Sequence, residues 1–315
     1  MSTPYIVFPD GFNKKLFVEL IETPELEVHQ ELKLSRAELL GLGEKVNGVV
    51  IRSATTMDKE AIDALPNLKY IIRAGEGTDN IDKKYCEEKG IKVSNTPGAN
   101  SNSAAEHAIA LMLTTLRKTS YAHQAMREGR WDKSLYAGNE LWKKTVGFVG
   151  FGRIGKIVAK RISGFDPRVI FYDPFIETDL EPNYQKKTLE EIFSESDIIT
   201  VHVPKTPQTE NLVNEKLLSL MKPSSILINA ARGGIVDEAA LLEALKAQKI
   251  RAAGLDVFSK EPLDESSEFR SLDNVVLTPH LGASTEEASV RVSLMAAQQL
   301  KEFFIKNNLV NEVKA

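Results

Sequence analysis

Cysteine is nearly absent from this chain of 315 residues, and neither sign of charge is in large excess. The single cysteine, Cys86, cannot form a disulfide within the chain, which favours a reducing compartment, the cytoplasm. The 40 Lys and Arg residues face 44 Asp and Glu residues, giving a formal net charge of -4. A chain without a basic surplus is not expected to bind nucleic acid.

Long apolar runs are also lacking. No stretch reaches the roughly 20 apolar residues that span a bilayer, and the start, Met1 to Phe8, lacks the basic and apolar segments of a signal peptide. We therefore expect no membrane association, and we predict no metal site. Hydrophobic residues make up 42% of the chain and charged residues 27%, which is typical of globular proteins, and the length favours two domains.

Two series of short apolar strands, each alternating with helical segments, indicate an α/β fold with parallel sheets. The first series has predicted strands at residues 5–8, 48–51, 70–72 and 91–93. Turn residues at 95–100 and a predicted helix at 101–116 separate it from the second series. The second series has predicted strands at residues 146–149, 169–172, 198–201, 226–228 and 275–277, before a last predicted helix at 285–306.

The glycine loop Gly150-Phe151-Gly152-Arg153-Ile154-Gly155 follows one of these strands and opens a helix predicted at 152–162. In a dinucleotide-binding loop the first glycine permits a tight turn, the second lets the backbone approach the pyrophosphate, and the third lets helix and strand pack closely. The N–H groups of the helix N-terminus then bind the phosphates. The alternative is an unrelated glycine-rich turn between a strand and a helix.

An acidic residue at the end of the next strand supports the dinucleotide interpretation. Asp173 lies 18 positions after Gly155. A carboxylate there can bind both ribose hydroxyls of NAD and would repel the 2′-phosphate of NADP. No arginine follows it closely, so the sequence favours NAD as the cofactor.

Three later segments place ionisable residues just past predicted strands. These residues are Arg232, Asp256 with Glu261, and His280. Strand carboxyl ends face the ligand crevice in a doubly wound sheet. Hydride transfer to a carbonyl needs a proton donor, for which His280 is suited, with Glu261 keeping the imidazole charged and oriented. Arg232 suits a substrate carboxylate. Taken singly, each could be a structural loop residue; their succession after the glycine loop favours catalysis.

These motifs resemble the family of D-isomer-specific 2-hydroxyacid dehydrogenases, from about residue 45 to about residue 290. The resemblance implies Arg232, Glu261 and His280 as the catalytic residues, and 96–101 with 105–107 as a hinge in which His107 packs or caps rather than catalyses. It implies a Rossmann cofactor domain, residues 100–284, inserted into a flavodoxin-like substrate domain of residues 1–99 and 285–315. The implied cofactor contacts are Gly150, Gly152, Arg153, Ile154, Gly155, Asp173, His202, Val203, Pro204, Ala230, Ala231, Arg232, Asp256, His280, Gly282 and Ala283.

Within the family, residues 51–55 and 73–82 are most similar to the branch that oxidises D-3-phosphoglycerate. The resemblance implies that Arg52 and Arg73 face a substrate phosphate, while the backbone of 75–77 holds the carboxylate. Glu76 departs from the pattern as an extra acid in this loop. The implied substrate contacts are Arg52, Ser53, Arg73, Gly75, Glu76, Gly77, Asn100 and Arg232.

Alternatives within the family are a hydroxypyruvate or glyoxylate reductase and a D-lactate dehydrogenase. An alternative of another class is an NAD(H)-sensing corepressor that binds peptides. The resemblance also implies a homodimer, formed by the helices after residue 100 and the arm 131–141, with Lys133 reaching the partner's site. Because the chain ends soon after its last predicted helix, we expect no C-terminal regulatory domain.

Overall fold

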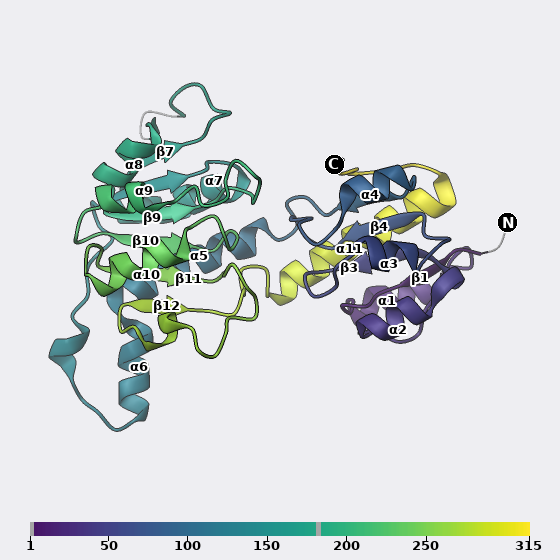
Figure 1. Cartoon of the computed structure of the whole chain (residues 1–315), viewed down its shortest axis with the longest axis horizontal. Helices are drawn as coiled ribbons and strands as arrows, with labels where there is room; N and C mark the ends of the chain where they lie inside the picture. Colours follow the sequence, from purple (N-terminus) through teal and green to yellow (C-terminus); the bar gives the residue numbers. More distant parts are fainter. Residues whose placement is uncertain (1–2, 181–183) are drawn as a thin grey trace. The chain divides into compact units, whose positions relative to one another are not determined.

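The computed structural model describes residues 3–180 and 184–315 of the chain (Figure 1). Met1 and Ser2, at the start of the predicted substrate domain, lie outside the described residues. The chain divides into two compact units, unit 1 with Met1–Asn100 and Ala283–Ala315, and unit 2 with Ser101–Gly282. Asn100, Ala283 and Ser284 therefore group with unit 1, whereas the sequence assigned them to the inserted domain.

Unit 1 is built on a parallel sheet with the strand order β2-β1-β3-β4-β5, the flavodoxin-like order that the sequence predicted. Its strands are β1 (Tyr5–Val7), β2 (Glu27–Val28), β3 (Val46–Ile51), β4 (Tyr70–Arg73) and β5 (Lys92–Asn95). Its helices are α1 (Lys14–Ile21), α2 (Arg36–Gly41), α3 (Lys59–Asp63), α4 (Lys83–Glu88) and α11 (Glu286–Lys306). The predicted strand 5–8 ends one residue early, because Pro9 has no N–H to continue the ladder.

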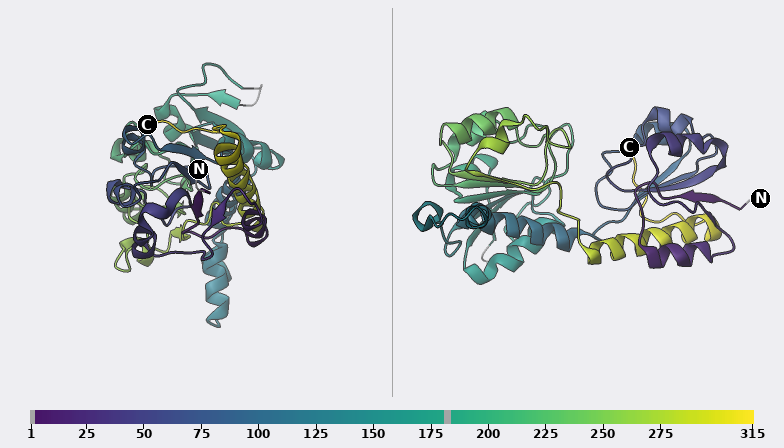
Figure 2. Two further views of the ribbon diagram at one scale, coloured as in Figure 1. Left: turned by 90° about the vertical axis from the view of Figure 1, so that its right-hand side faces the viewer. Right: turned by 90° about the horizontal axis from the view of Figure 1, so that it is seen from below.

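Helices cover both faces of this sheet. The side chains of α1 and α11 pack with strand residues into one apolar cluster, and Figure 2 shows these two helices side by side on one face. The opposite face packs against α2, α3 and α4, and Cys86 is buried in α4. The C-terminal helix thus completes a core that the first hundred residues begin.

Unit 2 has a larger parallel sheet with the order β12-β11-β10-β9-β6-β7-β8, which is the Rossmann order with an added strand. Its strands are β6 (Thr145–Val149), β7 (Arg168–Tyr172), β8 (Tyr184–Lys186), β9 (Ile198–Val201), β10 (Ile226–Asn229), β11 (Ala252–Leu255) and β12 (Val275–Leu277). Its helices are α5 (Ser101–Arg117), α6 (Thr119–Arg127), α7 (Arg153–Ile162), α8 (Leu189–Glu195), α9 (Glu215–Leu220) and α10 (Glu238–Lys246). The predicted fold class, two doubly wound parallel sheets, is confirmed.

The two faces of this sheet also carry separate apolar clusters. Helices α5 and α7 pack on one face, and α8, α9 and α10 pack on the other. Figure 1 shows α6 projecting from the rest of unit 2. Within residues 3–180 and 184–315, no helix combines the length and apolar character that a membrane span requires.

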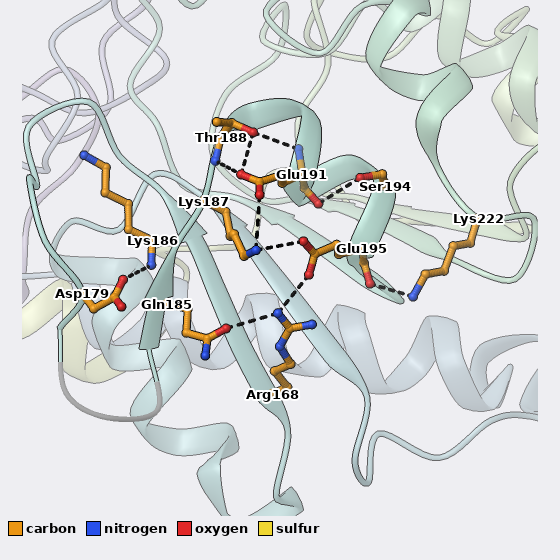
Figure 3. Close-up of polar contacts among 10 residues, drawn as sticks. All are labelled: Arg168, Asp179, Gln185, Lys186, Lys187, Thr188, Glu191, Ser194, Glu195 and Lys222. Carbon is orange, nitrogen blue, oxygen red and sulfur yellow. Dashed lines mark hydrogen bonds and ion pairs between the residues drawn. The ribbon is translucent and has the colours of Figure 1, made fainter.

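Polar contacts fasten α8 to the outer strands of unit 2 (Figure 3). Thr188 and Glu191 form a capping box at the start of the helix, and hydrogen bonds from Thr188 lower the pKa of Glu191 to about 2. Lys187 bridges Glu191 and Glu195 at 3.3 and 3.0 Å, while Arg168 on β7 pairs with Glu195 at 2.9 Å. This edge of the sheet is therefore held by ion pairs in addition to its short ladder.

Candidate active site

The predicted site residues of unit 2 follow the carboxyl ends of its parallel strands, so they lie along one edge of the sheet. The glycine loop follows β6, Asp173 follows β7 and Arg232 follows β10. The remaining predicted residues of unit 2 follow β9, β10, β11 and β12: His202, Val203, Pro204, Ala230, Ala231, Asp256, Glu261, His280 and Gly282. Ala283 belongs to unit 1.

Glycine is required at two positions of the loop for packing. Gly150 has a φ of +90°, and a Cβ there would lie 2.8 Å from the carbonyl oxygen of His202. A Cβ on Gly155 would lie 2.9 Å from the carbonyl oxygen of Gly150. Both contacts are closer than real Cβ atoms make. A side chain at Gly150 would push the loop away from the segment after β9, and one at Gly155 would push helix α7 away from the end of β6.

Gly152 differs, because a Cβ there would meet no heavy atom within 4 Å. It is the N-cap of α7, which has no side-chain cap and no acid in its first turn. The N–H groups at this helix end are therefore available to an anion. Open space beside a glycine and a bare helix N-terminus fit the pyrophosphate of a dinucleotide.

Asp173 is brought to the glycine loop, as its predicted role requires. One carboxylate oxygen accepts the N–H of Phe151 at 2.9 Å and the other accepts the N–H of Phe175 at 2.9 Å. The side chain is thereby fixed with two backbone donors, and its remaining lone pairs suit ribose hydroxyls. Its charge also suits NAD better than a 2′-phosphorylated cofactor.

His280 and Glu261 form a close polar pair at this edge. The Nδ1 atom of His280 lies 2.7 Å from Oε2 of Glu261, whose Oε1 accepts the N–H of Phe258 at 3.0 Å. Burial by itself would raise the pKa of Glu261, but these two hydrogen bonds hold it below its usual value. Because Nδ1 contacts the carboxylate, Nε2 is the ring nitrogen that can exchange a proton with a substrate.

A close backbone approach brings the Arg232 loop beside the Glu261 loop. A Cβ on Gly233 would lie 1.8 Å from the carbonyl oxygen of Phe258, so only glycine lets these loops pack. The amide of Asn229 donates to the carbonyl oxygen of Arg232 at 3.0 Å and fixes the turn. The structure thus brings the three predicted catalytic residues to neighbouring loops of one unit.

His202 is neutral at physiological pH. Burial lowers its pKa to about 4, and its Nε2 lies 2.9 Å from the hydroxyl of Thr200. Its ring stacks on Phe148 with a centroid distance of 5.9 Å. This residue therefore shapes the wall behind the glycine loop and adds no charge to it.

In unit 1, the predicted substrate residues also follow strand carboxyl ends. Arg52 and Ser53 follow β3, while Arg73 ends β4 and residues 75–77 follow it. The contacts that hold the first loop were not predicted from the sequence. A carboxylate oxygen of Asp10 accepts the N–H of Arg52 at 2.5 Å, and the amide of Asn80 donates to its carbonyl oxygen at 2.7 Å.

Glu76, the departure from the family pattern, has a local structural partner. Its Oε2 accepts the N–H of Gly98 at 2.7 Å, and its carbonyl oxygen accepts the side-chain amide of Asn95 at 2.7 Å. The carboxylate therefore ties the loop after β4 to the segment that leads to Asn100. Asn100 itself is buried.

Comparison with known proteins places the chain in a family. Residues 109–282 match the family model for the D-isomer specific 2-hydroxyacid dehydrogenase, NAD binding domain. The chain is 45% identical over 294 residues to hydroxypyruvate reductase of Thermotoga maritima, covering 92% of this chain and 95% of that one. It is 46% identical over 277 residues to D-3-phosphoglycerate dehydrogenase of Archaeoglobus fulgidus, covering 87% of this chain and 53% of the relative.

The chain thus spans about half the length of several curated relatives that it matches. A solved structure, the NAD-dependent formate dehydrogenase of Staphylococcus aureus in complex with NAD, matches with a TM-score of 0.88. It is 31% identical, and the match covers 99% of this chain and 98% of that one. The predicted family and the predicted NAD cofactor are both confirmed. The chain belongs to the family of D-isomer-specific 2-hydroxyacid dehydrogenases, and residues 109–282 match its NAD-binding domain.

Proposed function

We propose that this chain interconverts a D-2-hydroxy acid and its 2-keto acid, with His280 as the proton donor and acceptor. The observation that carries the proposal is the 2.7 Å contact between His280 and Glu261, at the sheet edge that also holds the glycine loop. When bound, NAD(H) supplies or accepts the hydride at C2 of the substrate. In the reductive direction Nε2 of His280 gives a proton to the carbonyl oxygen, which becomes the hydroxyl.

The neighbouring groups support this proton transfer. The carboxylate of Glu261 favours the charged imidazole and holds its orientation through Nδ1. Arg232 binds the substrate carboxylate and stabilises the negative charge that develops on the carbonyl oxygen. In the oxidative direction His280 accepts the hydroxyl proton.

We propose D-3-phosphoglycerate as the substrate, oxidised to 3-phosphohydroxypyruvate in the first step of serine biosynthesis. In this proposal Arg52 and Arg73 bind the phosphate, since a dianion needs cationic partners. Two hydrogen bonds support the role of Arg52, because they fix its backbone: its N–H donates to Asp10, and its carbonyl oxygen accepts the amide of Asn80. The relative from Archaeoglobus fulgidus, named for this substrate, agrees with it.

A second candidate is a hydroxypyruvate or glyoxylate reductase. It is favoured by the Thermotoga maritima relative, which the chain covers over 95% of its length. The 2-keto acids 3-phosphohydroxypyruvate and hydroxypyruvate differ only by the phosphate, so Arg52 should distinguish them. If no 2-hydroxy or 2-keto acid reacts, the result favours a binding or peptide-sensing role without turnover.

The experiment uses wild-type protein, Arg52→Ala and the control Arg36→Ala. It compares initial rates of NADH oxidation with 3-phosphohydroxypyruvate, hydroxypyruvate, glyoxylate and pyruvate, and measures NAD reduction with D-3-phosphoglycerate. Arg36 is an exposed arginine of unit 1 that pairs with Asp58 and Glu60. We expect Arg52→Ala to lower kcat/KM for the phosphorylated substrate by about 10- to 100-fold, the value of one or two charged hydrogen bonds, with little effect on hydroxypyruvate. Equal losses for both substrates contradict the phosphate role.

We further propose a homodimer formed through α6 and the arm that follows it. This segment and the residue after it expose large apolar side chains, with 79% exposure for Trp131, 61% for Leu135, 54% for Met126 and 53% for Trp142. Such a cluster is typical of an interface. The arm also carries Lys133, at the start of the 3-10 helix Lys133–Tyr136. Sedimentation of wild-type protein and Trp131→Glu tests this, with a dimer and a monomer expected.

A further inference from the structure

His107 lies on α5 and makes contacts that packing or capping does not explain. Its Nε2 atom is 3.1 Å from Oδ1 of Asp256 and 3.1 Å from the hydroxyl of Thr278. The side chain is only 18% exposed. Its two partners come from the loops after β11 and β12, which also carry Glu261 and His280.

The carboxylate of Asp256 is the centre of this cluster. Its side chain is 0% exposed, and it accepts the hydroxyl of Thr278 at 2.6 Å. It also accepts the N–H groups of Leu281 at 2.7 Å and Gly282 at 2.9 Å. Burial alone would raise the pKa of Asp256, but hydrogen bonds led by that with His107 hold it below its usual value, so it is charged.

The residues that bind Asp256 lie on both sides of His280 in the sequence. His280 has a φ of +54°, a conformation that residues other than glycine rarely adopt. Its N–H donates to the carbonyl oxygen of Asp256 at 2.8 Å. Thr278 and Leu281, two residues before and one after, both bind the Asp256 carboxylate. The left-handed backbone of His280 is therefore maintained by one buried anion.

The same anion joins the two ends of unit 2. Helix α5, which carries His107, begins at the first residue of the unit, and Gly282 is its last residue. A Cβ on Gly282 would lie 3.9 Å from Cα of Ala104 on that helix, so the two ends pack closely. His107 is the side chain of α5 that reaches the anion.

We propose that His107 is a positioning residue for His280, acting through the Asp256 carboxylate. Its Nε2–H donates a hydrogen bond to the buried carboxylate and so helps to hold that carboxylate against the 278–282 loop. The proposal rests on the proposed catalytic role of His280. It does not require His107 to touch substrate or cofactor.

The experiment uses three variants of the full chain. His107→Phe keeps a ring but removes the donor, and His107→Gln restores a donor near the position of Nε2. His29→Phe is the matched control, because it removes a histidine ring of unit 1 that contacts the hydroxyl of Tyr5 at 2.6 Å. Should His107→Phe fail to fold, His107→Ala replaces it. Each variant is measured by reductive kcat and KM, by NADH binding, and by amide hydrogen exchange of residues 278–282.

We expect His107→Phe to lower kcat by about 10- to 100-fold, since small displacements of a catalytic group have effects of this size. NADH affinity should stay within about threefold, while exchange of residues 278–282 rises. His107→Gln should recover most of both readouts, and His29→Phe should change neither. Wild-type kcat and exchange in His107→Phe overturn the proposal.

The exchange readout keeps the two proposals apart. A wild-type protein that reduces no 2-keto acid refutes the proposed function, whatever His107 does. An active wild-type protein in which His107→Phe leaves the 278–282 amides protected refutes the positioning role alone. Equal loss in His107→Phe and His107→Gln also refutes it, because only bulk and not the donor would then matter.

Discussion

Replacing Asp256 with asparagine tests the buried anion on which the His280 loop depends. The substitution keeps the shape but removes the charge, and the new amide has one oxygen and one NH2 group. With the oxygen at the Oδ1 position, Thr278, Leu281 and His107 keep an acceptor, while the NH2 group faces the N–H of Gly282. The opposite orientation would leave these three donors without an acceptor, so we expect the first orientation.

The expected cost has two parts. One buried N–H loses its acceptor, which costs about 1–3 kcal/mol, and the remaining hydrogen bonds lose their charge assistance. The sum is about 3 kcal/mol of the free energy of unfolding at neutral pH. For a unit of this size, each kcal/mol lowers the melting temperature by roughly 2–4 °C, so the melting temperature should fall by about 6–12 °C.

Urea unfolding at several pH values measures this difference in the free energy of unfolding, and the pKa of Asp256 predicts how the difference changes with pH. The pKa of Asp256 is lowered in the folded protein, so its contribution to stability is complete above the unfolded pKa near 4. That contribution is lost as the pH falls through the lower folded pKa. The difference between wild-type protein and Asp256→Asn should therefore be constant above about pH 5 and narrow below about pH 4. A difference under about 0.5 kcal/mol at pH 7 would refute a charged, fully hydrogen-bonded Asp256.

Three further predictions concern the cofactor edge of unit 2. Asp173→Ala should raise the ratio of NADPH to NADH use by at least about tenfold, because the carboxylate no longer repels a 2′-phosphate; an unchanged ratio contradicts its placement at the ribose. The pKa of His202 is about 4 when folded and near 6.5 when unfolded, so wild-type stability should fall by about 1.4 kcal/mol per unit as the pH drops below 6.5. Urea unfolding should show a shallower slope in His202→Gln, and equal slopes contradict a buried neutral ring. Gly152→Ala should weaken NADH binding without lowering the melting temperature, because its Cβ meets no protein atom. Gly233→Ala should lower the melting temperature, because its Cβ would lie 1.8 Å from the carbonyl oxygen of Phe258. Equal melting temperatures of the two variants would be evidence against the loop contact.

Local patterns were sufficient for most of the fold. Runs of buried β-branched residues located β6, β9 and β12 within a residue of their bounds, because such strands are apolar on both faces. The edge strands β2 and β8 were missed. They are two and three residues long and include polar side chains, so they carry no periodic signal.

The positions of the proposed catalytic residues were predictable, because each of them follows a strand end. Arg232, Glu261 and His280 each come shortly after an apolar run, and parallel strands bring their carboxyl ends to one edge. The glycine loop was predictable for the same reason. Gly150 and Gly155 proved to be packing requirements, while Gly152 faces open space.

The supporting contacts were not predictable, because they join residues far apart in the sequence. Asp10 reaches the loop of Arg52 across 42 positions, and His107 reaches Thr278 across 171. Both side chains look like ordinary helix or loop residues in isolation. Only the folded chain shows that Asp10 holds a backbone turn and that His107 faces a buried carboxylate.

The measurement that tests the central claim most directly is NADH oxidation with a 2-keto acid by wild-type protein and His280→Asn. The matched control is His29→Asn, in unit 1, whose ring contacts the hydroxyl of Tyr5. We predict turnover with at least one of hydroxypyruvate, 3-phosphohydroxypyruvate and glyoxylate, and a loss in kcat of about 100-fold or more in His280→Asn, with NADH affinity preserved. Turnover of His280→Asn within about threefold of wild type would contradict the assignment of His280 as the proton donor.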